Sequence, residues 1–317
     1  MPVSLRNFLF RHEAILGVLL VIALLVLTAQ SDRFFTAANV LNQGRLMTEV
    51  GLMALAMTFV IITGGIDLSV GSILGLTAII LGVLWQNIGL PLPLAMLLSV
   101  VAAGCAGLAN GTIITRFRVP PLIATLATLA LYRGLAEGIS EARSVRGYPE
   151  WFFVLGQGEA AGVPTQLWIL GVATIAAAFI LSKTSFGRQT YAIGANEVAA
   201  RFSGIHVDRV KLIVYSASGA AAGLAGVIFV SRVSTTRSDM GTGLELDVIT
   251  AVVLGGTSIF GGRGTIVGTA VGLVLVQAMK NGLALSGVKG DGTIVVIGAV
   301  LIAAILVSNL FGRNGDG

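Results

Sequence analysis

Charged side chains are scarce in this sequence, and those that occur are unevenly distributed. Asp, Glu, Lys and Arg make up 11% of the 317 residues, whereas soluble domains contain about 25%. No charged residue occurs in residues 14–31, 68–115, 160–182, 212–231 or 292–312. A chain with so few charged groups cannot cover a water-facing globule, which excludes an ordinary soluble domain.

Residue patterns that carry enzymatic chemistry are also lacking. Cys105 is the only cysteine, so no intrachain disulfide can form, and neither His12 nor His206 has a neighbour at metal-ligand spacing. The sequence has no G-x-S-x-G motif and no Gly-Lys dipeptide, hence no Walker A phosphate loop. Basic and aromatic residues do not cluster, so no nucleic-acid partner is expected. We predict that this chain is not an enzyme and has no catalytic residue, metal or cofactor of its own.

The apolar residues are arranged in long uninterrupted runs. The mean hydropathy is +0.93, and a helix needs ~20 apolar residues to cross a bilayer. Because the runs do not alternate with polar residues, a β-barrel is excluded and helices are expected. We predict an all-α integral membrane protein of about ten transmembrane helices, in a single domain over residues 1–317. The expected segments are 14–30, 47–63, 71–88, 93–115, 120–138, 166–182, 212–231, 246–258, 265–283 and 293–311.

Proline and glycine divide two of these regions. Pro91 and Pro93 mark a turn between two crossings in 68–115. The segment 246–258 is short and is interrupted by Gly255 and Gly256, so we expect a half-helix there. The first segment is long and no A-x-A site follows it, which favours a retained helix over a cleaved signal peptide.

The basic residues indicate the orientation, because short cytoplasmic loops are enriched in Lys and Arg. The loop 183–211 is the most basic, and an even number of crossings puts both termini on one side. We therefore expect this loop and both termini in the cytoplasm, where the net charge of +5 suits contact with anionic membrane lipid. The opposite loops are expected to contain Arg33, Arg45, Arg133, Arg143, Arg146, Arg232, Arg237, Lys280 and Lys289.

Two glycine-rich segments, 64–75 and 255–268, resemble each other when Gly64-Gly65 is aligned with Gly255-Gly256, the second copy being longer. Paired glycine-interrupted segments in the two halves of a transporter indicate a translocation pathway. Alternatively, the similarity reflects the abundance of glycine, since small residues pack transmembrane helices. The candidate pathway residues are Gly64, Gly65, Asp67, Ser69, Gly71, Gly255, Gly256, Gly261, Gly262 and Gly264.

Asp67 is the only charged residue between Glu49 and Arg116. An Asp at the centre of a membrane helix costs about 2.5–3.5 kcal/mol, so it normally faces a cavity, a partner or the interface. Asp67 either orders the glycine turn at the pathway or lies at a helix N-terminus, where the helix dipole and free N–H groups favour it. The two interpretations are compatible.

The basic loop 183–211 contains its own helix signals. Asn196 can cap a short helix, Gly204 can end it, and Glu197 complements the helix dipole. We predict a short helix over 194–204 that either docks in a groove of a partner or lies on the membrane surface. Its apolar patch would be Ala199, Ala200 and Phe202, with Arg201 at the rim. The candidate coupling residues are Gly194, Asn196, Glu197, Ala199, Ala200, Arg201, Phe202 and Gly204.

Four blocks, at 64–72, 121–134, 187–205 and 241–264, resemble the permeases of ribose-type (monosaccharide) ABC importers in the same order. The resemblance covers residues 14–311 approximately, and two blocks are most similar to the rhamnose and autoinducer-2 branches. It implies a type II ABC importer-like permease of the bacterial inner membrane that translocates a monosaccharide or related small polyol. It also implies that 187–205 is the loop that couples to an ATPase.

The resemblance further implies three partners. These are an ABC ATPase subunit that binds ATP and Mg, a periplasmic sugar-binding protein, and a second permease copy or a similar permease chain. The main alternative is an ion- or proton-coupled secondary transporter, which would need intramembrane ionisable residues. Asp67 is the only isolated candidate for that role. A membrane-embedded enzyme would need a catalytic side-chain set, and none is visible in the sequence.

Overall fold

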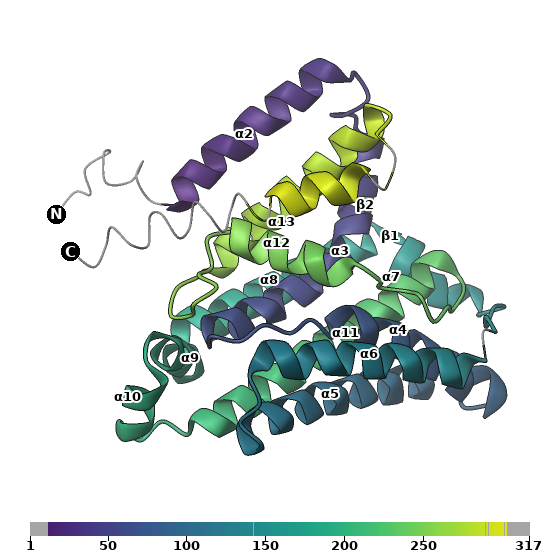
Figure 1. Cartoon of the computed structure of the whole chain (residues 1–317). Coiled ribbons are helices and arrows are strands. Elements are labelled where there is room, and N and C mark those ends of the chain that lie inside the picture. The colour runs from purple at the N-terminus through teal and green to yellow at the C-terminus, as the bar shows by residue number, and fades with distance from the viewer. Residues whose placement is uncertain (1–11, 142, 289, 291, 301, 303–317) are drawn as a thin grey trace.

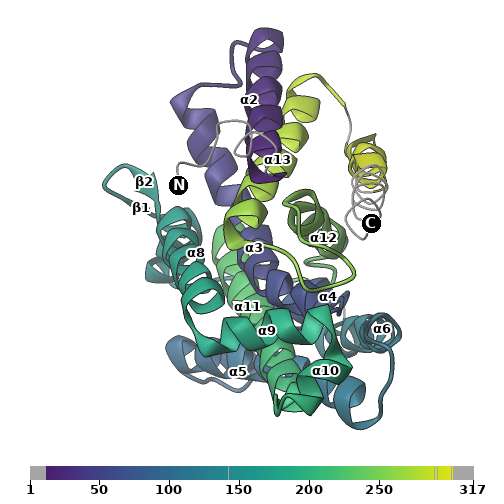
Figure 2. The ribbon, with the colours of Figure 1, turned by 90° about the vertical axis from the view of Figure 1, so that its left-hand side faces the viewer.

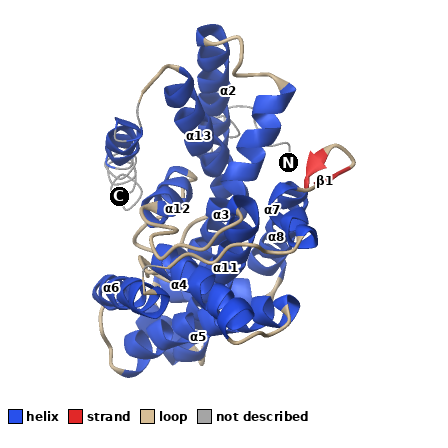
Figure 3. Cartoon of the chain, turned by 90° about the vertical axis from the view of Figure 1, so that its right-hand side faces the viewer, coloured by secondary structure: helices blue, strands red, loops and turns tan. Residues whose placement is uncertain are grey.

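The computed structural model describes residues 12–141, 143–288, 290, 292–300 and 302, and most of these are helical (Figures 1 and 3). The α-helices are α2 (His12–Gln30), α3 (Ala37–Ile62), α4 (Val70–Gly82), α5 (Leu92–Arg116), α6 (Pro121–Ser140), α7 (Val154–Gln157), α8 (Thr165–Lys183), α9 (Ser185–Ala195), α10 (Glu197–Phe202), α11 (Val207–Val233), α12 (Leu244–Leu254) and α13 (Ile266–Leu285). A π-helix, η1 (Val83–Asn87), extends α4, and a 3-10 turn, η2 (Glu150–Phe153), precedes α7. The strands β1 (Glu159–Ala160) and β2 (Val163–Pro164) form a short antiparallel hairpin.

Seven helices in the described part of the chain are long and apolar enough to cross a membrane: α3, α4 with η1, α5, α6, α8, α11 and α13. The multi-pass helical membrane architecture is therefore confirmed. Of the other expected segments, 14–30 corresponds to α2 and 246–258 to α12, which has 11 residues. In the segment 293–311, residues 293–300 and 302 are helical and the others lie outside the described residues, so the count of about ten crossings stays a prediction.

The helices α3, α4 and α11 form the centre of the molecule. α11 packs against α3, α4 and α5, while α4 packs against α6 and α13 against α12, α2 and α3. Figure 1 shows α5 and α6 at one end of the molecule and α2 at the other. In the most apolar window of α3, 78% of the residues are buried, against 17% in α8, so α8 lies at the periphery.

Glycine lets the two most extensively packed helices, α5 and α11, touch through their backbones. A Cβ on Gly107 would overlap the carbonyl oxygen of Tyr215, and a Cβ on Gly219 would overlap that of Ala103. This is the close approach expected of small residues in membrane helices. It occurs here within one chain.

Two expected boundaries were wrong. α3 begins at Ala37, ten residues before the expected segment, because Thr36 caps it by accepting a hydrogen bond from the Asn39 N–H (3.3 Å). α12 ends at Leu254, so Gly255 and Gly256 end this helix and do not interrupt it. The predicted turn between η1 and α5 is confirmed, since Pro91 immediately precedes α5.

Four basic residues expected in outer loops lie in helices. Arg45, Arg133, Arg232 and Lys280 belong to α3, α6, α11 and α13. Each of them has an acidic or carbonyl partner, and such pairing lowers the energetic cost of a charge within a membrane helix. The pattern of charge-free runs could not reveal these partners, because they come from distant segments.

The basic segment 183–211 is likewise not an open loop. It forms α9 and α10 and the first turn of α11, and Figure 2 shows α9 and α10 together on one side of the molecule. Thr184 caps α9 by accepting a hydrogen bond from the Gly187 N–H (3.3 Å). α9 extends to Ala195, so Gly194 belongs to α9 and not to the predicted short helix.

Candidate functional site

The first glycine turn ends α3 and leads into α4. Gly64 has a φ of +79°, a conformation that glycine adopts without a steric penalty. Its N–H donates to Ile61 O (2.9 Å), and the Gly65 N–H donates to Val60 O (3.1 Å). This pair of hydrogen bonds is the Schellman motif, which satisfies the last carbonyl groups of a helix.

The second glycine turn ends α12 in the same way. Gly256 has a φ of +88°; its N–H donates to Val253 O (2.9 Å), and the Thr257 N–H donates to Val252 O (3.2 Å). The structure therefore pairs Gly64 with Gly256. The alignment expected from the sequence, which paired Gly64 with Gly255, was wrong by one residue. The glycine with a left-handed backbone in the second turn is Gly256.

The first glycine turn lies against the connection that follows the second one. The Gly262 N–H donates to Ile62 O (2.9 Å), and a Cβ on Gly261 would lie 3.0 Å from Gly64 N. The segments that resemble each other in sequence thus meet in space. Gly255 and Gly71 lie at other close backbone contacts. A Cβ added to Gly255 would lie 2.5 Å from Gly268 O, and one added to Gly71 would lie 2.5 Å from Gly241 O.

Asp67 is fully buried in the turn between α3 and α4. Its Oδ1 accepts hydrogen bonds from the Ser69 N–H (3.0 Å) and Oγ (2.6 Å), and its Oδ2 accepts one from Ser218 Oγ (2.9 Å) on α11. Ser69 is the N-cap residue of α4, so Asp67 lies just before the N-terminus of this helix and accepts a backbone N–H there, which agrees with the helix-terminus interpretation. Asp67 orders the turn and joins it to α11. Whether it lines a pathway stays a prediction.

Two further polar residues belong to this network. Asn110 on α5 donates from Nδ2 to Ser69 Oγ (2.7 Å), and Tyr132 on α6 donates to Asn110 Oδ1 (3.2 Å). Together with Ser218 they connect the α3–α4 turn to α5, α6 and α11. The sequence analysis missed them. An Asn within the charge-free run 68–115 was the signal that could have found one of them.

Arg133 fixes a loop near the N-terminal part of α4. Its Nη1 donates to Met240 O (2.8 Å) and to Ser238 O, and its Nη2 donates to Gly71 O (3.4 Å). A single guanidinium group thus joins α6, α4 and the segment that precedes α12. Its five N–H donors suit this use, because carbonyl oxygens satisfy several of them at once.

Two ion pairs join other helices within the bundle. Arg232 on α11 contacts Glu49 on α3 (2.7 Å), and Lys280 on α13 contacts Asp247 on α12 (2.6 Å). The Glu49 side chain is only 2% exposed, so a missing partner would leave a buried charge. These pairs fix the relative positions of the helices that carry the glycine turns.

The short helix α10 has the predicted start and stop signals. Asn196 Oδ1 accepts a hydrogen bond from the Ala199 N–H (2.9 Å), which confirms Asn196 as the N-cap. Gly204 has a φ of +81°, and the Ile205 N–H donates to Ala200 O (3.0 Å). The six-residue helix is shorter than predicted but has the expected ends.

The exposed face of α10 differs from the predicted apolar patch. Ala200 is only 4% exposed and packs into the chain, whereas Phe202 is 90% and Val198 is 64% exposed. The prediction placed Ala200 on the surface because it ignored the contact of α10 with its neighbours. We call Val198, Ala199 and Phe202 the apolar face of α10.

Ion pairs join α10 to the start of α11. Arg201 contacts Glu197 (3.0 Å) and Asp208 (2.5 Å), and Lys211 contacts Glu197 (2.6 Å). Burial raises the pKa of Glu197, but the hydrogen bonds from Lys211 and Arg201 outweigh it, and the net pKa is below its usual value. Arg201 thus binds two carboxylates of its own chain, and its contact with a partner at the rim of the patch stays a prediction.

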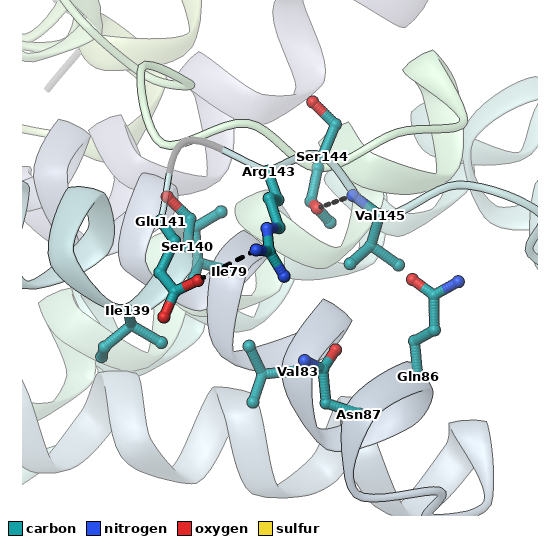
Figure 4. A pocket seen from close by; sticks show the side chains of 11 residues that line it. Ile79, Val83, Gln86, Asn87, Ile139, Ser140, Glu141, Arg143, Ser144 and Val145 are labelled. Carbon is teal, nitrogen blue, oxygen red and sulfur yellow. Dashed lines mark hydrogen bonds and ion pairs between the residues drawn. The ribbon is translucent and has the colours of Figure 1, made fainter.

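A cavity of about 390 Å³ lies at the C-terminal ends of α4 and α6 (Figure 4). Ile79 and Val83 contribute apolar lining, and Gln86 and Asn87 contribute amide groups. In Figure 4 the Arg143 side chain points toward Glu141, with 3.5 Å between Nη2 and Oε2. The cavity contains none of the candidate pathway residues and was not predicted from the sequence.

Comparison with known proteins adds an independent finding. The family described as "Branched-chain amino acid transport system / permease component" matches residues 38–305. The ribose import permease protein RbsC of Escherichia coli K12 is 40% identical over 312 residues, which covers 96% of this chain and 95% of that protein. RbsC of Bacillus subtilis 168 is 41% identical, covering 91% and 90%. The autoinducer 2 import system permease protein LsrD of Escherichia coli HS is 36% identical, covering 93% and 91%. No solved structure matches.

Proposed function

Since this chain belongs to the permease-component family, we propose that it is the membrane permease of an ABC importer for ribose or a closely related monosaccharide. The observation that carries the proposal is the 40% identity to a ribose import permease over nearly the full length of both chains. Similarity to an autoinducer 2 permease supports a small polyol as the wider substrate class. As a permease component, the chain is a non-catalytic membrane subunit.

Family membership implies an ATPase partner and a substrate-binding partner. The ATPase would bind ATP and Mg, which this chain has no motif to bind. An ion-coupled transporter would need a coupling site, but Asp67 is fully buried and its carboxyl group receives three hydrogen bonds. The family and these contacts both favour the ATP-driven importer.

Reconstitution tests this proposal. The permease would be purified with the ATPase and the binding protein of its own system, placed in liposomes, and supplied with radiolabelled monosaccharides. We expect ATP-dependent uptake of ribose or a close relative, and uptake should stop without the binding protein. Uptake that persists without ATP but requires a proton or sodium gradient would contradict the proposal.

The apolar face of α10 would dock on the ATPase. Val198 and Phe202 are one turn apart and strongly exposed, as an apolar side chain that fills a partner's groove would be. Ion pairs join this helix to the start of α11, so a partner that moved α10 would act on α11 as well. The other occupant of such a face would be the lipid surface.

Substitutions on the apolar face, one that adds a charge and one that removes the aromatic ring, distinguish the two occupants. Val198→Glu and Phe202→Ala should abolish co-purification with the ATPase or its sugar-stimulated activity, while the permease still inserts. Phe35→Ala is the matched control, because Phe35 is 65% exposed in the turn before α3. Normal assembly and transport by both α10 variants would contradict docking.

We also propose an orientation and an assembly. Both termini and α10 would face the cytoplasm of a bacterial inner membrane, and two permease chains of a type II importer-like fold, each with about ten crossings, would enclose the pathway. In a Cys105→Ser background, an impermeant maleimide should label Ser203→Cys only from inside and Ser144→Cys only from outside. The reverse pattern would invert the orientation. A single permease per active complex, measured by mass, would contradict the dimer.

A further inference from the structure

Three backbone segments that are distant in sequence meet at one point, which we call the glycine junction. It consists of residues 191–194 in the last turns of α9, 62–64 at the end of α3, and 261–264 in the connection between α12 and α13. The first glycine turn and the connection that follows the second one therefore reach the same helix, α9, which directly precedes α10 (Figure 2).

Gly194 is the centre of the junction. A Cβ at this position would overlap both Ile62 O and Gly262 N, and real Cβ atoms essentially never come closer than 3.0 Å to such atoms. Ile62 O and Gly262 N are themselves hydrogen-bonded at 2.9 Å. The Gly194 backbone thus lies directly over the hydrogen bond that joins the end of α3 to the 261–264 segment, with no side chain between them.

Tyr191 makes a second link from the same face of α9. Its hydroxyl group donates to Gly264 O (2.6 Å). Tyr191 lies three residues before Gly194 in α9. Helix positions separated by three residues lie on one face. The two residues therefore hold the 261–264 segment at two points, while Gly194 also contacts α3.

The path from α10 to this junction is short. Asn196 is at once the C-cap of α9 and the N-cap of α10, so no flexible linker separates the two helices. Close-packed backbone contacts transmit displacement because they cannot be compressed. A shift of α10 would therefore move the end of α3 and the 261–264 segment together.

We propose that Gly194 and Tyr191 are positioning residues that transmit the movement of α10 to the end of α3 and to the 261–264 segment during transport. The inference rests on the proposed function, since it assumes that a partner ATPase moves α10. It adds a specific route: through α9, α10 acts on the end of α3 and on the connection between α12 and α13. A second route exists through the ion pairs of Glu197 and Arg201 with α11, and the experiment separates them.

The test uses the reconstituted complex of permease, ATPase and binding protein. In Gly194→Ala, the methyl group must separate the segments of the junction. We expect the maximal stimulation of ATP hydrolysis by sugar and binding protein to fall at least about fivefold, within the usual range of allosteric coupling. Basal hydrolysis and the half-saturating concentration of the binding protein should not change. Tyr191→Phe keeps the ring but removes the hydroxyl, and should cause a smaller loss of the same kind.

Gly171→Ala on α8 is the matched control, because its Cβ would meet nothing within 4 Å. Wild-type stimulation in Gly194→Ala would overturn the inference and leave α11 as the route. If Gly194→Ala fails to insert, Tyr191→Phe decides: reduced stimulation with normal basal activity supports the junction, and unchanged stimulation overturns it. Failure of the proposed function is visible separately, since the wild-type complex would then not respond to any monosaccharide.

Discussion

Ser218 on α11 donates a hydrogen bond of 2.9 Å to the carboxyl group of Asp67 in the turn between α3 and α4. Both residues are fully buried. Because buried polar groups need hydrogen-bond partners, the carboxyl group is served by protein donors, and this hydrogen bond joins the first glycine turn to the central helix α11.

Removal of this donor should destabilise the permease. Ser218→Ala leaves one buried carboxyl oxygen of Asp67 without its hydroxyl donor, which costs about 1–3 kcal/mol. Thermal unfolding of the detergent-solubilised protein measures the effect. Ser182→Ala, which removes an exposed hydroxyl from α8, should leave the midpoint almost unchanged. Equal midpoints for the two variants would show that the Ser218 contact contributes no stability.

The ion pair between Glu49 and Arg232 should have a much larger effect than an exposed pair. Glu49→Gln leaves Arg232 without its partner in a largely buried position, and breaking a buried pair costs about 3–5 kcal/mol. Arg232→Gln should be equally harmful, and the double variant should recover part of the loss. A double-mutant cycle on thermal stability gives the coupling energy.

The exposed pair of Arg237 and Asp239, with both side chains 60% exposed, is the control for that cycle. An exposed pair contributes about 0–1 kcal/mol, so Asp239→Asn should hardly change stability. If the Glu49 and Arg232 variants behave like Asp239→Asn, the buried pair is not a structural element of the bundle.

Close helix packing predicts the effect of one methyl group. Gly219→Ala places a Cβ against the Ala103 carbonyl oxygen, so α5 and α11 must separate, and overpacking of this kind costs about 1–3 kcal/mol. Gly134→Ala should be neutral, because its Cβ would meet nothing within 4 Å. Thermal unfolding of the two variants compares them directly, and equal stability would mean that α5 and α11 are not held in contact.

The stability of α10 should depend on pH through Glu197. Its folded-state pKa lies below the usual value of 4.5, so the ionised form is stabilised by Lys211 and Arg201. This contribution is complete above about pH 4.5 and is lost as the pH falls through the lower folded-state pKa. Amide hydrogen exchange of residues 197–205, corrected for intrinsic rates, should show protection that decreases in this range.

Glu197→Gln is the control for the pH series. Asp208 also contacts Arg201 and titrates in both proteins, so the difference between wild type and variant isolates Glu197. The difference in protection should disappear at low pH, where both side chains are neutral. A difference that is constant from neutral to strongly acidic pH would contradict the assigned role of the Glu197 charge.

The sequence by itself determined the features that depend on neighbouring residues. Apolar runs locate the membrane helices because a helix satisfies its backbone hydrogen bonds within the segment. Asn196 and Gly204 define the ends of α10 because a cap acts on N–H and C=O groups only a few positions away. The four sequence blocks also identified the permease family, which agrees with the match over residues 38–305.

Only the tertiary structure decided which of these features meet. Asp67 and Ser218 are 151 residues apart, and no local pattern specifies that pairing. Gly194 looked like part of a coupling helix, yet its role as a contact surface follows from backbone atoms of two distant segments. The face of α10 that is exposed depends on what covers Ala200. Such contacts form only when separate helices pack, so their identity is a property of the folded chain.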